Sequence, residues 1–447
     1  MANDLTSLPP SRRDRPPGPR GVKLVRALLD WQRDALPTLE RMTAEYGDVA
    51  YIPLPGGGAF LLGHPDLIEH VLIRNVDNYH KTTASKWARH FFGNAMQINN
   101  GEYARQIRRL VAPVFHGEKL ARAYGDLIVR ETAAAVSGWV AGHRPQMTQD
   151  LIDLVLNVVV QIFFGTTPGE ETRHVGEMFM ASLTPIGAIL PSWVPRSRNS
   201  KYVKATQALD AWVLNRIAER RRDGTPGYDF LSVLASLGKE GLTLTDAQIR
   251  DELVAYTLAG YSSSTALNQI LRLVAEHPVV DAELAAELQL VIGNRDPVMH
   301  DLHELHYLGM VMKEALRLCP PAGMMFRRAV AEDVIGGWTI PAGARMFVSS
   351  WVVQRDGRFF DEPLEFRPER WTPEFERALP ACAYFPFGRG PRACIGGAMG
   401  ELILQMMIAT ICRRFRLVAL HKLDSHRSEW PAILAAGGVQ AEIHPRS

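Results

Sequence analysis

Cysteine is scarce in this chain of 447 residues: it has four, Cys319, Cys382, Cys394 and Cys412, and none forms a Cys-x-x-Cys pair. That spacing excludes a disulfide framework and a structural zinc site of the usual kind. Charge of one sign is lacking too, because 50 Lys and Arg residues face 48 Asp and Glu residues and leave a net charge of +2. We therefore expect no overall attraction to nucleic acid or to an anionic membrane.

Long apolar runs are also missing. The most apolar stretch, LIDLVLNVVVQIFFG at 151–165, is too short to span a bilayer and is interrupted by Asp153, Asn157 and Gln161. The first 21 residues are polar and rich in Pro and Arg, without the apolar centre of a signal peptide. We expect a buried helix at 151–165, no membrane contact and a cytoplasmic location.

What the sequence does contain is mainly helical patterning. Residues 118–320 show helical periodicity with breaks at Gly- and Pro-rich turns. Short β-type runs surround a Pro-Gly turn at 49–63, and extended structure returns at 333–351 and 433–443. With no repeat and no long linker, the chain predicts a mainly α fold with small β-sheets (α+β). We expect an N-terminal arm at 1–22, one large domain at 23–447, and a monomer.

One predicted helix, at 245–277, is weakest at its centre. Thr245 and Gln248 form a capping box before it, and His277 precedes a proline that stops it. Its core-facing stripe of large apolar residues is interrupted by Gly260 and Ser263, within AGYSSST. Two explanations are open: close helix–helix packing through small residues, or a notch that makes room for a ligand.

A second unusual stretch, FPFGRGPRACIGGAMG at 385–400, surrounds one cysteine with glycines and leads into an apolar helix. Glycines let the backbone approach a large flat group, and N–H groups at a helix start together with Arg389 and Arg392 would lower the pKa of a thiol. A free cysteine is more commonly inert packing. The spacing of Phe387, Gly388, Gly390, Arg392, Cys394 and Gly396, however, resembles the haem-binding loop of the cytochromes P450, the haem-thiolate monooxygenases.

Further motifs of that family follow in its order. EALR places Glu314 and Arg317 one helical turn apart, and FRPERW supplies Arg370. The resemblance extends upstream through GEYARQIRRLVAPVF at 101–115 and covers essentially the whole chain. It implies a single helix-rich fold that holds haem b between the long helix and the helix after the cysteine. It also implies a buried charge network of Glu314, Arg317 and Arg370.

The resemblance assigns roles to individual residues around the haem. Cys394 is the implied axial ligand of the iron. The rest of the implied haem contacts are Phe387, Gly388, Ile395 and Gly396 in the loop and, for the propionates, Arg108, Arg327 and Arg392. For Arg108 an alternative is open, since Arg105, Arg108 and Arg109 could form one solvated basic face. Ala104 stands where the family usually has Trp or His, so one propionate contact is expected to be missing.

On the opposite side of the haem, Ala259, Gly260, Ser262 and Ser263 match the family's oxygen-binding segment. The family's acid–Thr pair is here Ser262–Ser263. A serine hydroxyl relays protons but is a poor proton source near pH 7. We expect Ser263 to face the haem and Ser262 to point about 100° away from it. Tyr261, Met324 and Met325 are further candidates for a substrate pocket.

Three functions are compatible with these residues. The favoured one is an O₂-activating monooxygenase that hydroxylates or epoxidises a mid-sized, largely apolar or aromatic molecule in secondary metabolism. The second is oxidative ring closure or coupling, in which a substrate N–H or O–H joins the proton path. The third is a haem-thiolate sensor or carrier without turnover.

The family resemblance also implies a source of electrons. They would come from NAD(P)H through a ferredoxin-type partner and its reductase, because no flavin or iron–sulfur segment is recognisable in the chain. Two pairs of arginines could form the docking patch for that partner, or simply a solvated face: Arg105, Arg109, Arg413 and Arg414.

The cysteine loop generates a spectroscopic prediction. We expect the purified protein to carry b-type haem and its ferrous CO complex to show the red-shifted Soret band of thiolate ligation. Cys394→Ala should lose that band. A Cys394→Ala protein that keeps it would overturn the ligand assignment.

Overall fold

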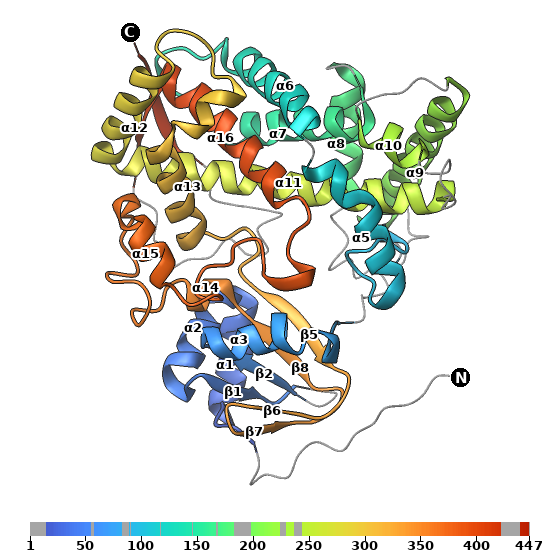
Figure 1. Cartoon of the computed structure of the whole chain (residues 1–447), viewed down its shortest axis with the longest axis vertical. Coiled ribbons are helices and arrows are strands. Elements are labelled where there is room, and N and C mark those ends of the chain that lie inside the picture. The colour runs from blue at the N-terminus through green and yellow to red at the C-terminus, as the bar shows by residue number, and fades with distance from the viewer. Residues whose placement is uncertain are drawn as a thin grey trace.

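The computed structural model describes residues 15–54, 58–82, 89, 91–116, 118–144, 146–166, 169–182, 198–223, 229–236, 244–421 and 439–446 (Figure 1). Its α-helices are α1 (Val22–Arg33), α2 (Ala35–Tyr46), α3 (Pro65–Glu69), α5 (Gly101–His116), α6 (Glu118–Val136), α7 (Met147–Phe164), α8 (Glu170–Ser182), α9 (Arg198–Asp223), α10 (Phe230–Ser236), α11 (Asp246–Glu276), α12 (Pro278–Val291), α13 (His306–Leu318), α14 (Ser350–Val353), α15 (Pro373–Ala378) and α16 (Gly397–Arg414). Its strands are β1 (Val49–Ile52), β2 (Ala59–Leu62), β3 (Tyr79–Lys81), β4 (Gly142–His143), β5 (Met325–Ala329), β6 (Asp333–Ile335), β7 (Trp338–Ile340), β8 (Arg345–Val348), β9 (Phe415–Ala419) and β10 (Ala441–Pro445).

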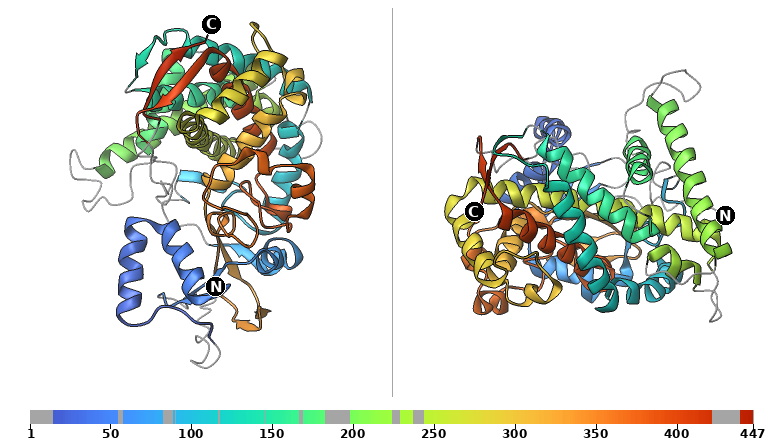
Figure 2. Two further views of the ribbon diagram at one scale, coloured as in Figure 1. Left: turned by 90° about the vertical axis from the view of Figure 1, so that its left-hand side faces the viewer. Right: turned by 90° about the horizontal axis from the view of Figure 1, so that it is seen from above.

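Most of the helices surround α11, which runs across the helical part in Figure 1 and in the right-hand view of Figure 2. A mixed sheet of order β1-β2-β8-β5-β3 lies at the lower end in Figure 1, beside α1, α2 and α3. The parallel pairing of β2 with β8, in which Leu62 lies opposite Val348, joins segments far apart in the chain. The prediction of a mainly α fold with small sheets is confirmed.

The predicted strands lie where the patterns placed them. The hairpin at 49–63 is β1 and β2, paired antiparallel. The extended segment 333–351 contains β6, β7 and β8. In the stretch 433–443, residues 433–438 lie outside the described residues, and the end of it begins β10.

Helix α11 begins and ends as its caps predict. The Thr245 hydroxyl accepts a hydrogen bond from the Gln248 backbone N–H at 3.3 Å, and the Gln248 side chain accepts from the Thr245 N–H at 2.9 Å. The helix runs unbroken through AGYSSST. The Ser262 and Ser264 hydroxyls each donate to the carbonyl three residues earlier, at 2.6 and 2.8 Å. These bonds satisfy the hydroxyls without opening the helix.

Gly260 is required by the approach of α7. A Cβ atom built on Gly260 would lie 2.9 Å from a methyl carbon of Val159 and 3.3 Å from the Phe163 ring, both on α7. Of the two explanations for the small residues in this helix, close helix–helix packing therefore holds for Gly260. Helix α7 is longer than the predicted apolar stretch, and by length and composition alone it could cross a membrane. It is 67% buried within the protein and packs along α11, so it is a core helix.

The charge network predicted from EALR and PERW is present and buried. Neither Glu314 nor Arg317 has any exposed side-chain surface. Arg317 donates twice to the Glu314 carboxylate, at 2.9 and 2.8 Å, and Arg370 donates to it at 2.9 Å. Arg317 also donates to the Gln354 carbonyl, and the Gln354 side chain accepts from the Phe385 N–H. The network thus extends to the residue that begins the cysteine loop.

Glu314→Gln should destabilise the protein strongly, because it leaves the buried Arg317 and Arg370 facing no carboxylate in this network. We expect a loss of about 3–5 kcal/mol, the usual result of breaking a buried ion pair. Urea denaturation followed by circular dichroism measures it. The control is Glu376→Gln, which removes an exposed pair with Lys313 and should cost less than about 1 kcal/mol. Equal losses in the two variants would contradict the assigned role of Glu314.

Candidate active site

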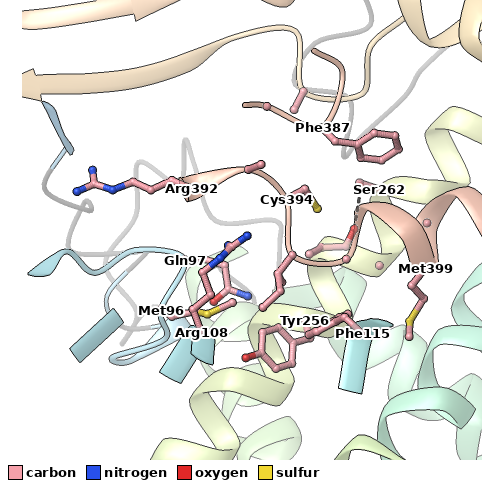
Figure 3. Close-up of a pocket in the computed structure, with 18 of the residues that line it drawn as sticks. Met96, Gln97, Arg108, Phe115, Tyr256, Ser262, Phe387, Arg392, Cys394 and Met399 are labelled. Atoms are coloured by element: carbon pink, nitrogen blue, oxygen red, sulfur yellow. Dashed lines mark hydrogen bonds between the residues drawn. The ribbon is translucent and has the colours of Figure 1, made fainter. Parts of the chain in front are cut away.

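A cavity of about 570 Å³ lies between α11, the cysteine loop and the start of α16 (Figure 3). The walls also include residues 96–101 and one side of α5. From α11 the lining residues are Tyr256, Ala259, Gly260, Ser262 and Ser263. From the loop they include Phe387, Gly388, Arg392, Cys394, Ile395 and Gly396. The motifs that sequence analysis singled out far apart in the chain therefore meet around one space.

Two glycines give the cysteine loop its shape. Gly388 and Gly390 have φ angles of 72° and 73°, which favour glycine. A Cβ atom on Gly390 would lie 2.3 Å from the Leu72 carbonyl oxygen, so no other residue fits there. The Cys394 N–H donates to the Phe387 carbonyl at 2.7 Å and closes the loop. The Cys394 side chain lines the cavity.

The pKa of the Cys394 thiol is raised, whereas the sequence predicts a lowered one. Burial raises it, and the Gly396 N–H and the Arg108 charge only partly oppose that effect. The expected contribution of Arg389 and Arg392 is absent from the interactions that act on this thiol. Desolvation of the sulfur is the largest of these effects and outweighs the Gly396 N–H and the Arg108 charge. Coordination to a metal would deprotonate this thiol.

Cations gather at one side of the cavity without matching carboxylates. Arg108 and Arg392 line it together with Lys81 of β3, and Arg327 of β5 is buried beside them. Burial and the neighbouring arginines lower the pKa of Lys81 to about 8, and burial and Arg392 lower that of Arg327 to about 10. Among the lining residues in the described part of the chain, Asp77 is the one acid.

The buried Arg327 and the half-buried Arg392 have few partners among the described residues. Arg327 Nη1 donates to the Phe326 carbonyl, while its Nε has no hydrogen-bond partner among the described residues. Arg392 donates to the Tyr79 carbonyl at 2.7 Å. Buried charges without counter-charges are costly. The cluster therefore suits a ligand that carries carboxylates on this side of the cavity.

The predicted propionate ligands are placed consistently with that role. Arg108 lines the cavity, as Figure 3 shows, and Arg105 also lines it while donating to Glu102 at 3.0 Å. Arg109 does not line the cavity and donates to Glu102 at 2.6 Å. Arg108 is half-buried and therefore does not share one solvated face with the exposed Arg105 and Arg109. Ala104 also lines the cavity, and Lys81 adds a cation that no sequence motif indicated.

Ser262 and Ser263 both line the cavity, so the expectation that Ser262 points well away from the site is corrected. The physical reason is that the cavity contacts more of the circumference of α11 than the single row of residues that includes Gly260 and Ser263. Ser262 is partly exposed and Ser263 is nearly buried.

Of the three pocket candidates, Met325 lines the cavity and the other two do not. Tyr261 packs into the main hydrophobic core, and Met324 packs into a second core cluster with Leu36 and Trp351. Their placement in the pocket is therefore corrected. Tyr261 lies on the opposite side of α11 from the cavity, and Met324 precedes a strand in which successive side chains alternate in direction.

The comparisons with known proteins agree with this geometry. A sequence model of the cytochrome P450 family, described as "Cytochrome P450", matches residues 16–436. Cyclooctat-9-en-7-ol 5-monooxygenase of Streptomyces melanosporofaciens is 31% identical over 89% of this chain and 88% of its own. Pentalenene oxygenase of Streptomyces avermitilis is 28% identical over 89% of this chain and 90% of its own.

Among solved structures, that of a retinoic-acid-bound cyanobacterial CYP120A1 superposes with a TM-score of 0.82 at 20% identity. It covers 98% of this chain and 100% of that one, and at this identity it establishes the fold. Fold, loop and cationic cavity define a haem-thiolate oxidase. The chain belongs to the cytochrome P450 family and is an enzyme of the monooxygenase/oxidase class.

Members of the family use haem b, O₂ and electrons that pass from NAD(P)H through a redox partner. The residues present fit this cofactor. Cys394 would coordinate the haem iron, and Arg108, Arg327, Arg392 and Lys81 would hold the propionates. The bound haem supplies the reductive activation of O₂, for which the thiolate ligand is suited.

The cationic cluster generates a prediction about haem retention. Arg327→Ala and Arg392→Ala should each weaken haem binding by about 1.5–3 kcal/mol, the worth of a hydrogen bond to a charged group. Arg108→Ala should do likewise. The rate of haem transfer to excess apomyoglobin measures the effect. Arg109→Ala on the outer side of α5 is the control, and an Arg108→Ala protein that retains haem equally well would contradict a propionate role.

Proposed function

We propose that this enzyme hydroxylates or epoxidises a mid-sized, largely apolar small molecule of the terpenoid kind in secondary metabolism. The observation that carries the proposal is the lining of the cavity beyond the cations. It is formed mainly by apolar side chains: Met96, Phe115, Val159, Ile162, Phe163, Met325 and Ile403. Apolar walls with few polar groups are typical of sites for small apolar ligands.

The relatives support the same substrate class. Their names give cyclooctat-9-en-7-ol and pentalenene as the molecules on which they act. A second relative from Streptomyces melanosporofaciens, cyclooctatin synthase, is 29% identical over 89% of this chain. The non-catalytic sensor or carrier is set aside, because these relatives are oxygenases.

Oxidative ring closure or coupling is the second candidate, and one observation favours it. Ser262 replaces the acid that the family usually has beside the oxygen site, so the distal wall lacks a carboxyl group at that position. The Ser262 hydroxyl donates to the Ala259 carbonyl. The Ser262 oxygen can still accept a hydrogen bond from another group. A substrate N–H or O–H placed there would join the proton path.

Turnover separates these two reactions. With cyclooctat-9-en-7-ol and with pentalenene as trial substrates, and a surrogate ferredoxin and reductase, mass spectrometry reports the product. Gain of one oxygen atom supports hydroxylation or epoxidation. Loss of two hydrogen atoms without oxygen supports coupling and contradicts the favoured reaction. Absence of any product or spectral shift with terpenoids as a class contradicts the proposed substrate.

For the electron supply we propose a ferredoxin-type partner, with the enzyme acting as a cytoplasmic monomer that binds neither nucleic acid nor membrane. The four arginines considered for docking fall into two groups. Arg105 and Arg109 share Glu102, and Arg413 and Arg414 share Asp296. The α5 group is the better candidate for docking an acidic partner, because the same helix carries Arg108 into the cavity.

The serine pair generates a prediction about coupling. If hydroxyls relay protons, removing them should raise the hydrogen peroxide released per NAD(P)H consumed. Ser263→Ala should increase it, and because Ser262 also lines the cavity, the double variant Ser262→Ala/Ser263→Ala should increase it further. Ser264→Ala, whose hydroxyl lies outside the cavity lining, is the control. A double variant that couples as well as the wild type would show that water or substrate alone carries the protons.

A further inference from the structure

Three consecutive residues at the start of α11 bind the backbone of the segment 91–96. Arg250 donates to the Phe91 carbonyl at 2.8 Å. Asp251 accepts from the Asn94 N–H at 2.7 Å, and Glu252 accepts from the Met96 N–H at 2.7 Å. Successive helical residues point about 100° apart. One turn of α11 therefore holds the segment at three points along its length.

The same segment is also held by β3. Lys81 Nζ donates to the Met96 carbonyl at 2.9 Å. The Met96 residue is thus bound at its N–H by a carboxylate and at its C=O by an ammonium group. Lys81 also exchanges backbone hydrogen bonds with the Asn100 side chain, at 2.8 and 3.2 Å.

The attachment is tightly fitted and largely buried. Glu252 has no exposed surface and Arg250 is buried. A Cβ atom on Gly93, whose φ is +55°, would lie 2.1 Å from the Asp251 carboxylate. Arg250 is itself fixed, because its guanidinium binds Asp210 of α9 and Asp251.

The residues that follow these attachment points form one wall of the cavity. Met96, Gln97, Asn99 and Asn100 line it, opposite the Ala259–Ser263 turn of α11, and Figure 3 shows Met96 and Gln97 beside Arg108. Residues 94–100 of this wall form no helix or strand. Their own backbone hydrogen bonds are local turns, such as that from the Ile98 N–H to the Ala95 carbonyl at 3.1 Å. The attachment of the wall to α11 and β3 is therefore made by side chains.

We propose that Arg250, Asp251 and Glu252 are positioning residues that fix this wall, and thereby set the shape of the space offered to the substrate. The same helix would then carry the oxygen-side serines at its centre and the anchor of the substrate-facing wall near its start. This inference rests on the proposed function only in taking residues 96–100 as substrate-facing. When the wall is already ordered, the free energy of substrate binding does not include the entropy cost of ordering it.

The attachment at Met96 should depend on pH. Tyr103 of α5, Lys81 of β3 and, on α11 itself, Asp251 and Tyr256 face the Glu252 carboxyl. Burial dominates these interactions and raises the pKa of Glu252 to about 7. The ionised carboxylate is the stronger acceptor. The Met96 bond is therefore strongest above pH 7 and weakens as the pH falls through 7.

The raised pKa also fixes the sign of the effect on stability. A carboxyl group that binds its proton more tightly in the folded protein contributes stability at low pH, and this contribution is lost as the pH rises through 7. Glu252→Gln removes the buried charge and keeps an oxygen that can accept from Met96. The variant should therefore fold at neutral pH.

Hydrogen exchange of the haem-loaded protein tests the attachment without a substrate. We expect the Met96 amide of the wild type to gain protection, corrected for intrinsic exchange, between pH 6 and pH 8. Glu252→Gln should abolish this change, whereas Glu131→Gln should keep it. Glu131 is a buried glutamate of α6 that accepts from Asn157 of α7 and does not line the cavity. An unchanged pH dependence in Glu252→Gln would overturn the proposal.

Ligand size supplies the second readout. Imidazole and 4-phenylimidazole bind haem iron and differ in how far they extend toward the walls. Asp251→Ala and Glu252→Ala should weaken 4-phenylimidazole relative to imidazole by roughly tenfold, the equivalent of one hydrogen bond of usual strength. An unchanged affinity ratio with unchanged exchange contradicts the positioning role. Changed exchange and ratio without turnover of any terpenoid would leave the positioning role standing and contradict the proposed function instead.

Discussion

The carboxylate of Glu314 is the point on which the haem-side half of the molecule depends. It accepts hydrogen bonds from the side chains of Arg317, Arg370 and Trp371 and from the Arg367 backbone. A buried charge is tolerated only when its hydrogen-bonding capacity is filled. Filling it requires α13 and the segment 361–371 to be in place together. This segment, whose one regular element is the short 3-10 helix Pro368–Arg370, is thereby fixed by one side chain from α13.

The cations of the cavity differ from the Glu314 network in how their charge is compensated. Arg327 and Lys81 are desolvated, and each is acted on by neighbouring positive charges that lower its pKa. Around Glu314 the protein supplies its own counter-charges, whereas at the cavity it leaves that part to a ligand. Binding of an anionic group that the unfolded chain does not bind then stabilises the folded state. The Glu314 network therefore holds the cysteine loop in place, and the cations at the cavity favour a ligand that carries anionic groups.

Sequence analysis predicted the features that local chemistry determines. The caps of α11 follow from Thr245 and Gln248, and the course of the cysteine loop follows from glycines at positions with positive φ. The features it missed depend on tertiary placement. Lys81 belongs to a three-residue strand without a motif, and its cavity position arises from pairing with β5. The raised pKa of Cys394 depends on burial, which spacing does not reveal.

The same distinction explains the errors on α11. The helical period correctly placed Gly260 toward a neighbour, but the neighbour that leaves no room for a Cβ atom there is α7. The width of the cavity is set by what lies across it, so the period alone could not separate Ser262 from Ser263. Tyr261 is a pocket candidate because the family resemblance implies substrate contacts from this helix, whereas the side chain packs into the core.

The parallel pairing of β2 with β8 has a consequence for the synthesis of the protein. Residues 59–62 leave the ribosome long before residues 345–348, their partners in the sheet, have been made. At about 5–20 residues per second this interval is on the order of tens of seconds. During it β2 presents an open edge, the kind of surface that pairs wrongly with other chains. Cys394 emerges later still, so the cysteine loop is made only after both strands of this pair.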